Sequence, residues 1–240
     1  MTNEEKTVER LKAFDTASIT NVVASYPGDA AGCLGLYNPW RVNWYTDERI
    51  HCVFPELGPR VGYAVTVRYG MPDSNYHRLD FGDVLRAIDR SPKPVIVVME
   101  QALPEAIRHK NGLSGGNMTT AMKRVGCVGV VTDGPSRDMQ EIREMDFQYL
   151  LTGICAGHGD FQIDAVNVPV SVCGMDVAPG ELIHMDENGA CKFPADRARQ
   201  VLELVEKLCD KEKTHMQTMR ESATTEDLVA IFTNEKKQTM

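Results

Sequence analysis

Apolar and polar positions follow strand spacing in several short stretches of the chain. Residues 62–69 alternate and are rich in β-branched side chains, which predicts a strand. Residues 95–99 and 127–131 are apolar runs of the length expected for buried strands. Further strands are predicted at 51–54, 147–155, 168–173, 180–185 and 190–193, the last two flanking a hairpin-like turn. Residues 156–167 carry glycine and aspartate and are predicted to form a loop.

Helical spacing predicts helices before and between these strands. Thr2 and Glu5 have the spacing of a capping box, and apolar residues follow at helical intervals. Asp15 or Thr16 is expected to cap a second helix. Internal helices are predicted at 81–89, 118–125 and 137–145, with a weaker helix or a loop at 102–109.

The C-terminal part of the chain is predicted to be helical. Pro194 begins a long segment with one apolar stripe as far as Leu208, and a last short helix follows Thr224 or Thr225. Beyond Cys209 the stripe becomes thin, although the helical spacing continues. A helix that extends past its own core in this way is typical of a contact with a neighbouring subunit, and a solvated tail is the alternative.

Residues 27–60 interrupt the regular pattern. They are rich in glycine and proline and hold both tryptophans, Trp40 and Trp44. This aromatic-rich excursion is either a packed surface loop or a lid or subunit contact. Because no linker is evident, we predict a single domain over residues 1–240, with residues 195–240 as a C-terminal helical extension.

Composition narrows the classes of function. A formal net charge of −8 argues against nucleic-acid binding, which requires a basic face. The longest strongly apolar run, 94–99, is too short for a membrane span. The first ten residues are charged and lack the apolar segment of a signal peptide, and the seven cysteines show no disulfide framework. We therefore expect a cytoplasmic protein with reduced thiols and no membrane partner.

Candidate chemistry concentrates in residues 112–146. Gly115 and Gly116 precede a helix, and their backbone N–H groups could approach a ligand closely at its positive end. After the strand at 127–131, a tight turn leads to Arg137 and Asp138. Arginine suits a carboxylate because its planar fork donates two parallel hydrogen bonds, and aspartate suits a hard cation such as Mg²⁺. The stretch therefore predicts a site for a small carboxylate and a divalent cation.

Two common phosphate-binding motifs are absent from the sequence. It contains no GK[ST] phosphate loop and no GxGxxG dinucleotide fingerprint. Cys155 and His158 have CxxH spacing, but no second pair could complete a zinc site. His158 is either a residue near the substrate or a solvated loop histidine.

The spacing of Gly116, twenty further residues and then Arg137-Asp138-x-x-Glu141 resembles a family signature. It is similar to that of class II pyruvate aldolases acting on 4-hydroxy-4-methyl-2-oxoglutarate and 4-carboxy-4-hydroxy-2-oxoadipate, in the RraA-like family. The resemblance covers roughly residues 60–210. It implies an α/β sandwich of the swivelling β/β/α type, with a long C-terminal helix packing on a neighbouring subunit. Trimers or dimers of trimers with intersubunit sites are implied as well.

The resemblance also assigns roles to individual residues. Arg137 would bind the pyruvyl carboxylate, and Asp138 would be the direct ligand of Mg²⁺ or Mn²⁺. Backbone amides at Asn117 and Met118, beside the glycine pair, would hold the oxo-acid end of the substrate. Glu212 from a neighbouring subunit would hold a metal-bound water. Asn117 would help to hold that water but departs from the family, whose aldolases usually carry an acidic residue at this position.

The implied activity is that of a metal-dependent lyase. It would cleave a 4-hydroxy-2-oxo acid through a metal-stabilised enolate and release pyruvate, with oxaloacetate decarboxylation as a side activity. Two alternatives remain at this stage. One is a non-enzymatic regulator of ribonuclease activity, which needs a binding surface and no metal. The other is a related decarboxylase or hydratase acting on another oxo acid or a sugar acid.

Overall fold

The computed structural model describes residues 2–26, 32–41, 43–76 and 79–238. The helices are α1 Asn3–Leu11, α2 Thr16–Val23, α3 Phe81–Arg90, α4 Glu105–Arg108, α5 Gly116–Arg124, α6 Met139–Glu144, α7 Ala198–Glu221 and α8 Thr225–Gln238. The strands are β1 His51–Cys52, β2 Arg60–Gly70, β3 Val95–Gln101, β4 Cys127–Thr132, β5 Pro135–Ser136, β6 Gln148–Leu151, β7 Gly153–Ile154, β8 Gln162–Val166, β9 Val170–Val172, β10 Met175–Val177, β11 Leu182–Asp186 and β12 Gly189–Phe193. Short 3-10 turns lie at Pro55–Leu57 and Ala195–Arg197.

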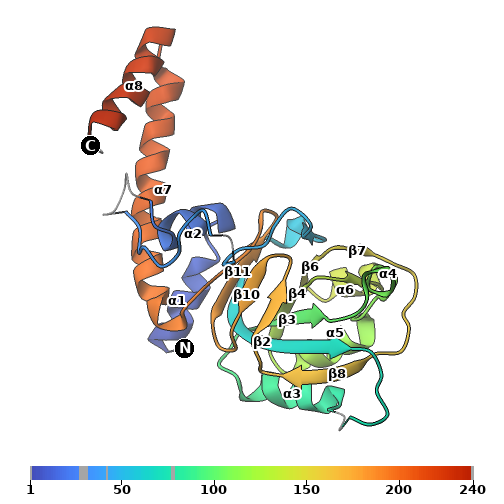
Figure 1. Cartoon of the computed structure of the whole chain (residues 1–240). Helices are drawn as coiled ribbons and strands as arrows, with labels where there is room; N and C mark the ends of the chain where they lie inside the picture. The colour runs from blue at the N-terminus through green and yellow to red at the C-terminus, as the bar shows by residue number, and fades with distance from the viewer. Residues whose placement is uncertain (1, 27–31, 42, 77–78, 239–240) are drawn as a thin grey trace.

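Strand β2 organises the main eight-stranded sheet. Seven strands follow the order β1-β6-β4-β3-β2-β11-β12, and the eighth, β8, pairs with β2 beside this path. Strands β2, β3, β4 and β6 run parallel, as expected where helices connect successive strands. β2 is long enough to pair antiparallel with β11 through its first half and with β8 through its second half. The parallel strands bring the chain segments that follow β3 and β4 to one edge of the sheet (Figure 1).

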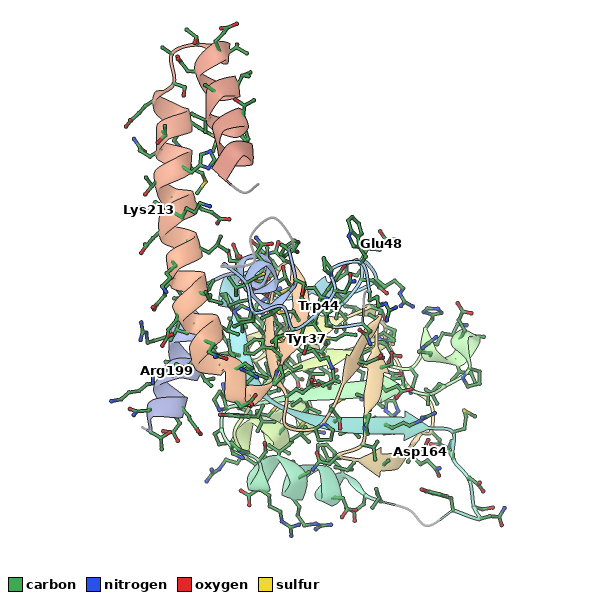
Figure 2. All side chains as sticks on the ribbon, turned by 60° about the vertical axis from the view of Figure 1, so that its left-hand side comes forward. Tyr37, Trp44, Glu48, Asp164, Arg199 and Lys213 are labelled. Carbon is green, nitrogen blue, oxygen red and sulfur yellow. The ribbon has the colours of Figure 1, made fainter. Side chains whose placement is uncertain are left out.

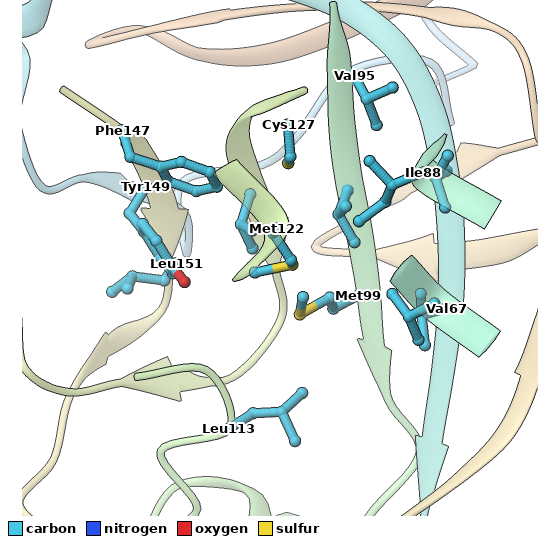
Figure 3. Close-up of a cluster of buried hydrophobic side chains, with 14 of the residues drawn as sticks. Val67, Ile88, Val95, Met99, Leu113, Met122, Cys127, Phe147, Tyr149 and Leu151 are labelled. Atoms are coloured by element: carbon cyan, nitrogen blue, oxygen red, sulfur yellow. The ribbon is translucent and has the colours of Figure 1, made fainter. Parts of the chain in front are cut away.

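Each face of the sheet has its own buried core. Helices α3, α5 and α6 cover one face, where Val67, Met99, Met122 and Tyr149 are fully buried together (Figure 3). The β9–β10 hairpin covers the other face. Its side chains pack against alternate residues of the same strands, because successive strand residues point to opposite faces. The result is a β/β/α layering, and the predicted α/β sandwich is confirmed.

A third core joins the N-terminal helices to the C-terminal one. Val8, Val22 and Val201 belong to this cluster, which packs α1, α2 and the first half of α7 against β11 and β12. The second half of α7, marked by Lys213, continues away from the body together with α8 (Figures 1 and 2). Across the described ranges, no helix is both long and apolar enough to cross a bilayer.

A buried polar cluster ties the N-terminal helices to the sheet. The Thr16 amide donates to Asp186 Oδ2 over 2.7 Å, and the Thr16 hydroxyl lies 2.9 Å from His184 Nδ1. His184 Nε2 is 3.2 Å from the Leu11 carbonyl, so Nε2 donates and Nδ1 accepts in a neutral imidazole. Burial lowers the pKa of His184, which keeps the ring in this neutral form.

Most predicted elements are confirmed, with boundary shifts of a few residues. Thr2 forms the predicted capping box with Glu5, and Asp15 caps α2. The β11–β12 hairpin and both C-terminal helices are present, and Thr224 accepts a hydrogen bond from the Asp227 amide in the first turn of α8.

One prediction at the strand level is wrong, and two predicted strands are present with other bounds. The loop expected over 156–167 contains β8, a short strand with a bulge opposite Arg68 and Tyr69, in which only Ile163 is buried. The strand expected over 147–155 is divided into β6 and β7. The strand expected over 168–173 is shorter and turns back at Cys173 and Gly174. Both of these residues have positive φ, which permits the tight β9–β10 connection.

The aromatic-rich excursion is packed in part. Trp44 is fully buried and stacks on Tyr37 with ring centroids 5.2 Å apart (Figure 2). Trp40 is 89% exposed. The strand predicted at 51–54 shrinks to β1, which pairs with β6. Residues 27–31 and 42 of the excursion lie outside the described residues.

Candidate functional site

The candidate site lies where the segments following β3 and β4 meet. The first segment, 102–115, leads into α5 through the glycine pair. The second passes through β5 and places Arg137 and Asp138 immediately before α6. Ligand sites of α/β sheets characteristically lie at the carboxyl ends of parallel strands. The tight turn predicted after β4 therefore delivers the Arg-Asp pair to such a position.

A cavity of about 220 Å³ collects most of the residues expected in the site. It is lined by Gly115, Asn117, Met118, Arg137 and Asp138, together with His158 and Phe161 from the loop before β8. Glu212 lies on the second half of α7, which extends away from the body (Figure 1). One chain therefore does not bring Glu212 to the cavity, and its role in a neighbouring subunit's site stays a prediction.

Asp138 adopts an unusual backbone conformation, with φ 61° and ψ 37°. Its carboxylate does not cap α6, the helix that it precedes. Instead Oδ2 accepts a 2.9 Å hydrogen bond from the Gly116 amide, at the start of α5. A left-handed conformation at a residue other than glycine costs about 1–3 kcal/mol and persists only where the surroundings enforce it. Here it aims the carboxylate across to the neighbouring helix.

The glycine pair is explained by the carboxylates that touch it. A Cβ at Gly115 would lie 2.3 Å from Asp138 Oδ2, and a Cβ at Gly116 would lie 2.1 Å from Glu141 Oε2. We expected the glycines to let backbone amides approach a ligand, whereas the Gly116 amide is bonded to the protein's own Asp138. Glu141 is thus part of the site, although the sequence indicated no role for it beyond its position in the Arg-Asp-x-x-Glu motif. The sequence signal that could have identified it is its three-residue spacing from Asp138, which places both side chains near each other at the start of α6.

Two amides at the start of α5 remain for a ligand. The described residues offer no hydrogen-bond partner to the backbone N–H of Asn117 or of Met118, and both residues line the cavity. First-turn amides carry the positive end of the helix dipole and favour an anion. Arg137 adds a full positive charge beside them. Its Nε is 3.8 Å from Asp138 Oδ2, and its side chain is 36% exposed. The cavity is therefore suited to a carboxylate.

A cluster of buried hydroxyl groups holds the glycine loop in place. The Tyr149 hydroxyl lies 2.7 Å from Ser114 Oγ and 2.8 Å from Thr119 Oγ1, and Ser136 donates to the Ser114 carbonyl. These contacts connect the loop, α5, β5 and β6, so they fix the two halves of the site against each other. Burial raises the pKa of Tyr149 to about 12, which keeps its hydroxyl protonated as a donor. The sequence pattern did not reveal this cluster, because its members are far apart in the chain.

The loop before β8 closes one side of the cavity. His158 is exposed, its Nδ1 lies 3.1 Å from the Gly159 carbonyl, and its ring contacts Phe161 edge-on. His158 is therefore a solvated loop histidine at the rim of the cavity, and its role near a substrate stays a prediction. Cys155 donates to the Gly157 carbonyl. Within the described chain, no three His, Cys, Asp or Glu side chains form a metal-binding group, so the CxxH pair has no zinc partners.

The turn after β4 also borders a second, more polar cavity of about 480 Å³. Asp133 faces this cavity, and its carboxylate accepts from the Gln101 amide over 2.7 Å and from Arg108 over 3.1 Å. Burial raises the pKa of Asp133 even though Arg108 and the Gln101 amide act in the opposite direction. The two cavities are thus separate, and Arg137 and Asp138 line only the smaller one.

Comparison with known proteins gives this geometry a family. The model of the RraA-like family, described as Aldolase/RraA, matches residues 39–191. The chain belongs to the RraA-like family. The match includes the glycine loop, the Arg-Asp pair and strand β11, so the predicted family is confirmed.

Two relatives in sequence illustrate the range of this RraA-like family. An uncharacterized protein of Methanocaldococcus jannaschii is 27% identical over 153 residues, which cover 63% of this chain and 69% of that protein. The 4-hydroxy-4-methyl-2-oxoglutarate aldolase of Thermus thermophilus is 33% identical over 89 residues. That alignment covers 35% of this chain and spans about half, 52%, of the Thermus protein.

A solved structure supports the fold of the RraA-like chain over nearly its whole length. Streptomyces coelicolor RraAS2, described as an unusual member of the RNase ES inhibitor RraA protein family, superposes with a TM-score of 0.65. The superposition covers 90% of this chain and 98% of that one at 20% identity. At this identity the likeness concerns the fold alone.

Proposed function

We propose that this RraA-like protein is a divalent-cation-dependent carbon–carbon lyase that cleaves a 4-hydroxy-2-oxo acid and releases pyruvate. The observation that carries the proposal is the content of the 220 Å³ cavity. It combines the Arg137 guanidinium, the Asp138 carboxylate and two free amides at the start of α5. A 2-oxo acid offers a carboxylate to the Arg137 guanidinium and to the two amides, and the Asp138 carboxylate suits a hard cation.

The donor groups of the cavity fit Mg²⁺ or Mn²⁺. Asp138 uses Oδ2 for the Gly116 amide, while Oδ1 has no hydrogen-bond partner among the described residues. Magnesium typically takes one or two protein carboxylates and keeps several waters, so Asp138 with the substrate's own oxygens is a sufficient set. When bound, the cation would supply Lewis-acid stabilisation of the pyruvate enolate.

The protein's own groups would orient the substrate. Arg137 binds its carboxylate through the guanidinium fork, and the amides of Asn117 and Met118 hold the oxo-acid end. Cleavage removes a proton from the C4 hydroxyl and transfers the C3–C4 electron pair to the enolate, which is later protonated at C3. A water held by the Asn117 carboxamide would carry these protons. Oxaloacetate decarboxylation forms the same enolate and is the expected side activity.

The test is pyruvate release from oxaloacetate and from 4-hydroxy-4-methyl-2-oxoglutarate, with Mg²⁺ and with excess EDTA. We expect activity that EDTA abolishes and added metal restores. Arg137→Ala should lower kcat/KM about 100-fold or more, and Arg137→Lys should recover only part of it, because lysine lacks the planar fork.

Arg143→Ala is the matched control for this test. Arg143 lies on α6 close in sequence, is exposed and pairs with Glu56 over 3.0 Å outside the cavity. Its removal should leave turnover unchanged. Metal-independent turnover, or full activity of Arg137→Ala, would refute the proposed mechanism. Absence of turnover with every 2-oxo acid, combined with ribonuclease binding that survives Asp138→Ala, would favour a regulator instead.

A further inference from the structure

A second hollow of about 370 Å³ lies directly beside the candidate site. Its apolar lining comes from Tyr69, Leu79, Phe81, Met118, Phe161 and Ile163. These residues belong to β2, the segment before α3, the first turns of α3 and α5, and the region of β8. The hollow is thus built on the strand that organises the sheet and on the helix that opens the site.

The hollow and the candidate site share a wall. Met118 and Phe161 line both cavities. Met118 is in the first turn of α5, where its amide faces the oxo-acid end of the site. Phe161 contacts His158 of the site, with ring centroids 6.0 Å apart, and Tyr69 of the hollow, with centroids 5.6 Å apart. A ligand held at Arg137 therefore has the hollow as its neighbouring space.

Tyr69 is the unusual polar residue among those that line the hollow. Tyr69 is fully buried, and its hydroxyl has no hydrogen-bond partner among the described residues. The equally buried Tyr149 shows the usual arrangement, since its hydroxyl meets both Ser114 and Thr119. Buried hydroxyl groups without partners are uncommon and call for an explanation. Burial also raises the pKa of Tyr69 above its ordinary value, so the group is a neutral donor.

The charge of the hollow restricts what it can hold. Among the described residues that line the hollow, Asp80 is the single charged side chain, and none is an arginine or a lysine. A carboxylate entering the hollow would lose its hydration without gaining a cation and would meet a like charge. An apolar group would instead gain from the removal of its surface from water. The hollow therefore disfavours a charged substituent and favours an apolar one.

We propose that the substrate's C4 substituent is an apolar chain or ring that fills this hollow and presents one hydrogen-bond acceptor to the Tyr69 hydroxyl. This inference rests on the proposed function, because it places the substrate's oxo-acid end at Arg137. It ranks such a substrate above 4-hydroxy-4-methyl-2-oxoglutarate, whose C4 substituents include a carboxylate and which should therefore react more slowly. The substrate class is a 4-hydroxy-2-oxo acid with an uncharged, mainly apolar tail.

Substituted oxamates test the tail without requiring turnover. Oxamate resembles pyruvate with an amide nitrogen in place of the methyl group. A substituent on this nitrogen therefore occupies the position that C4 has in the substrate. Calorimetry on the full chain with Mg²⁺ would compare oxamate, N-butyloxamate and N-(2-methoxyethyl)oxamate. We expect both extended compounds to bind at least about tenfold more tightly than oxamate, because they bury several methylene groups. The methoxy compound tests the acceptor, since it matches the butyl compound in length.

Two variants distinguish binding in the hollow from binding of the oxo-acid end at Arg137. Leu79→Trp should fill the hollow and reduce the affinity for N-butyloxamate about tenfold, while the affinity for oxamate is unchanged. Met71→Trp is its control, because Met71 is exposed and outside the lining. Tyr69→Phe should reduce the affinity for N-(2-methoxyethyl)oxamate about tenfold and leave the affinity for N-butyloxamate unchanged. Tyr63→Phe is its control, on the same strand but packed against the third core.

The outcomes distinguish this inference from the proposed function. Equal affinity for oxamate and both extended compounds overturns the apolar tail pocket, whereas the oxaloacetate assay decides separately whether the lyase proposal stands. Unchanged binding of the methoxyethyl compound to Tyr69→Phe overturns the role of the hydroxyl group. If Leu79→Trp does not fold, the conservative Tyr69→Phe and the comparison of ligands on the unaltered protein still give a result. Failure of all three compounds to bind also overturns the inference.

Discussion

At the scale of single residues, the site is defined by two carboxylates that lie close to the backbone of a glycine pair. Asp138 and Glu141 occupy the space in which Cβ atoms of Gly115 and Gly116 would otherwise lie. The left-handed backbone of Asp138 is the local cost of this arrangement. The glycines therefore matter because they leave room for the protein's own acidic groups.

Replacing Gly115 tests this close approach. Gly115→Ala should displace the Asp138 carboxylate and lower kcat/KM about 100-fold, because small displacements of catalytic groups have effects of that size. Thermal unfolding should change little, since the displaced atoms are at the end of a side chain. Gly153→Ala is the control, because no atom lies within 4 Å of the position that its Cβ would take. Wild-type kinetics in Gly115→Ala would contradict the assignment.

His184 is a second residue with a measurable consequence. Its folded-state pKa lies below the ordinary value of 6.5 because of burial. As the pH falls below about 6.5, the unfolded chain binds a proton that the folded protein does not, so the free energy of unfolding decreases. Urea unfolding between about pH 8 and pH 5.5 should show this loss.

Two histidine variants identify the source of that pH dependence. His184→Gln should flatten the decrease below about pH 6.5, because it removes the titrating group. His109→Gln should retain the decrease, since His109 is exposed at the C-terminal end of α4. An identical pH profile in wild type and His184→Gln would assign the effect to another group.

At the scale of elements, the Tyr149 hydroxyl cluster determines how the two halves of the site are held together. It joins β6 to the glycine loop and to α5 through Ser114 and Thr119. The loop itself has little regular structure, so these bonds and the Leu113 amide bond to the Pro135 carbonyl supply its attachment. The geometry of the site thus depends on contacts behind it.

Removing the Tyr149 hydroxyl should reveal this dependence. Tyr149→Phe leaves the buried Ser114 hydroxyl without its partner, whereas Thr119 still donates to the Gly115 carbonyl, so we expect a loss of about 1–3 kcal/mol in the free energy of unfolding. Turnover should fall as well, because the glycine loop is less firmly positioned. Tyr26→Phe, at a partly exposed tyrosine, should change neither quantity. Chemical denaturation together with the pyruvate assay would measure both effects.

The elements that the sequence predicts well are those with strong local signals. Strand β2 and helix α3 have clear apolar periodicity, and α1 and α2 have side-chain caps. Strand β8 was missed because its pairing with β2 is a tertiary contact and only Ile163 is buried. The site was predicted from Arg137 and Asp138 through motif and spacing. Its backing by Tyr149 and its neighbouring hollow at Tyr69 depend on residues that only folding brings together.

At the scale of the whole molecule, the outer half of α7 and all of α8 lie beyond the cores of the body (Figure 1). Glu212 is on this projecting part and cannot reach its own chain's cavity. We infer that it serves a neighbour's site in a trimer or a dimer of trimers. The proposed function would then require assembly, since each site would draw Asp138 from one chain and Glu212 from another.

Mixing inactive variants tests shared sites directly. Arg137→Ala and Glu212→Ala should each have low activity alone. After unfolding and joint refolding, about a quarter of the sites should combine an intact Arg137 with a neighbour's intact Glu212, so activity should return to that fraction. Light scattering would establish the oligomer size. Activity of the mixture that equals the average of the separate variants would place the whole site within one chain.

The contrasting tryptophans give the molecule an internal optical reporter. Trp44 is enclosed beside Tyr37 in the core formed with α1, α2 and α7, whereas Trp40 is 89% exposed. The chain has only these two tryptophans, and neither lines the candidate site. A blue-shifted emission component from Trp44 would therefore report the packing of α1, α2 and α7 against the sheet. Ligand binding at Arg137 should leave this emission unchanged. Release of these helices could then be observed separately from events in the candidate site.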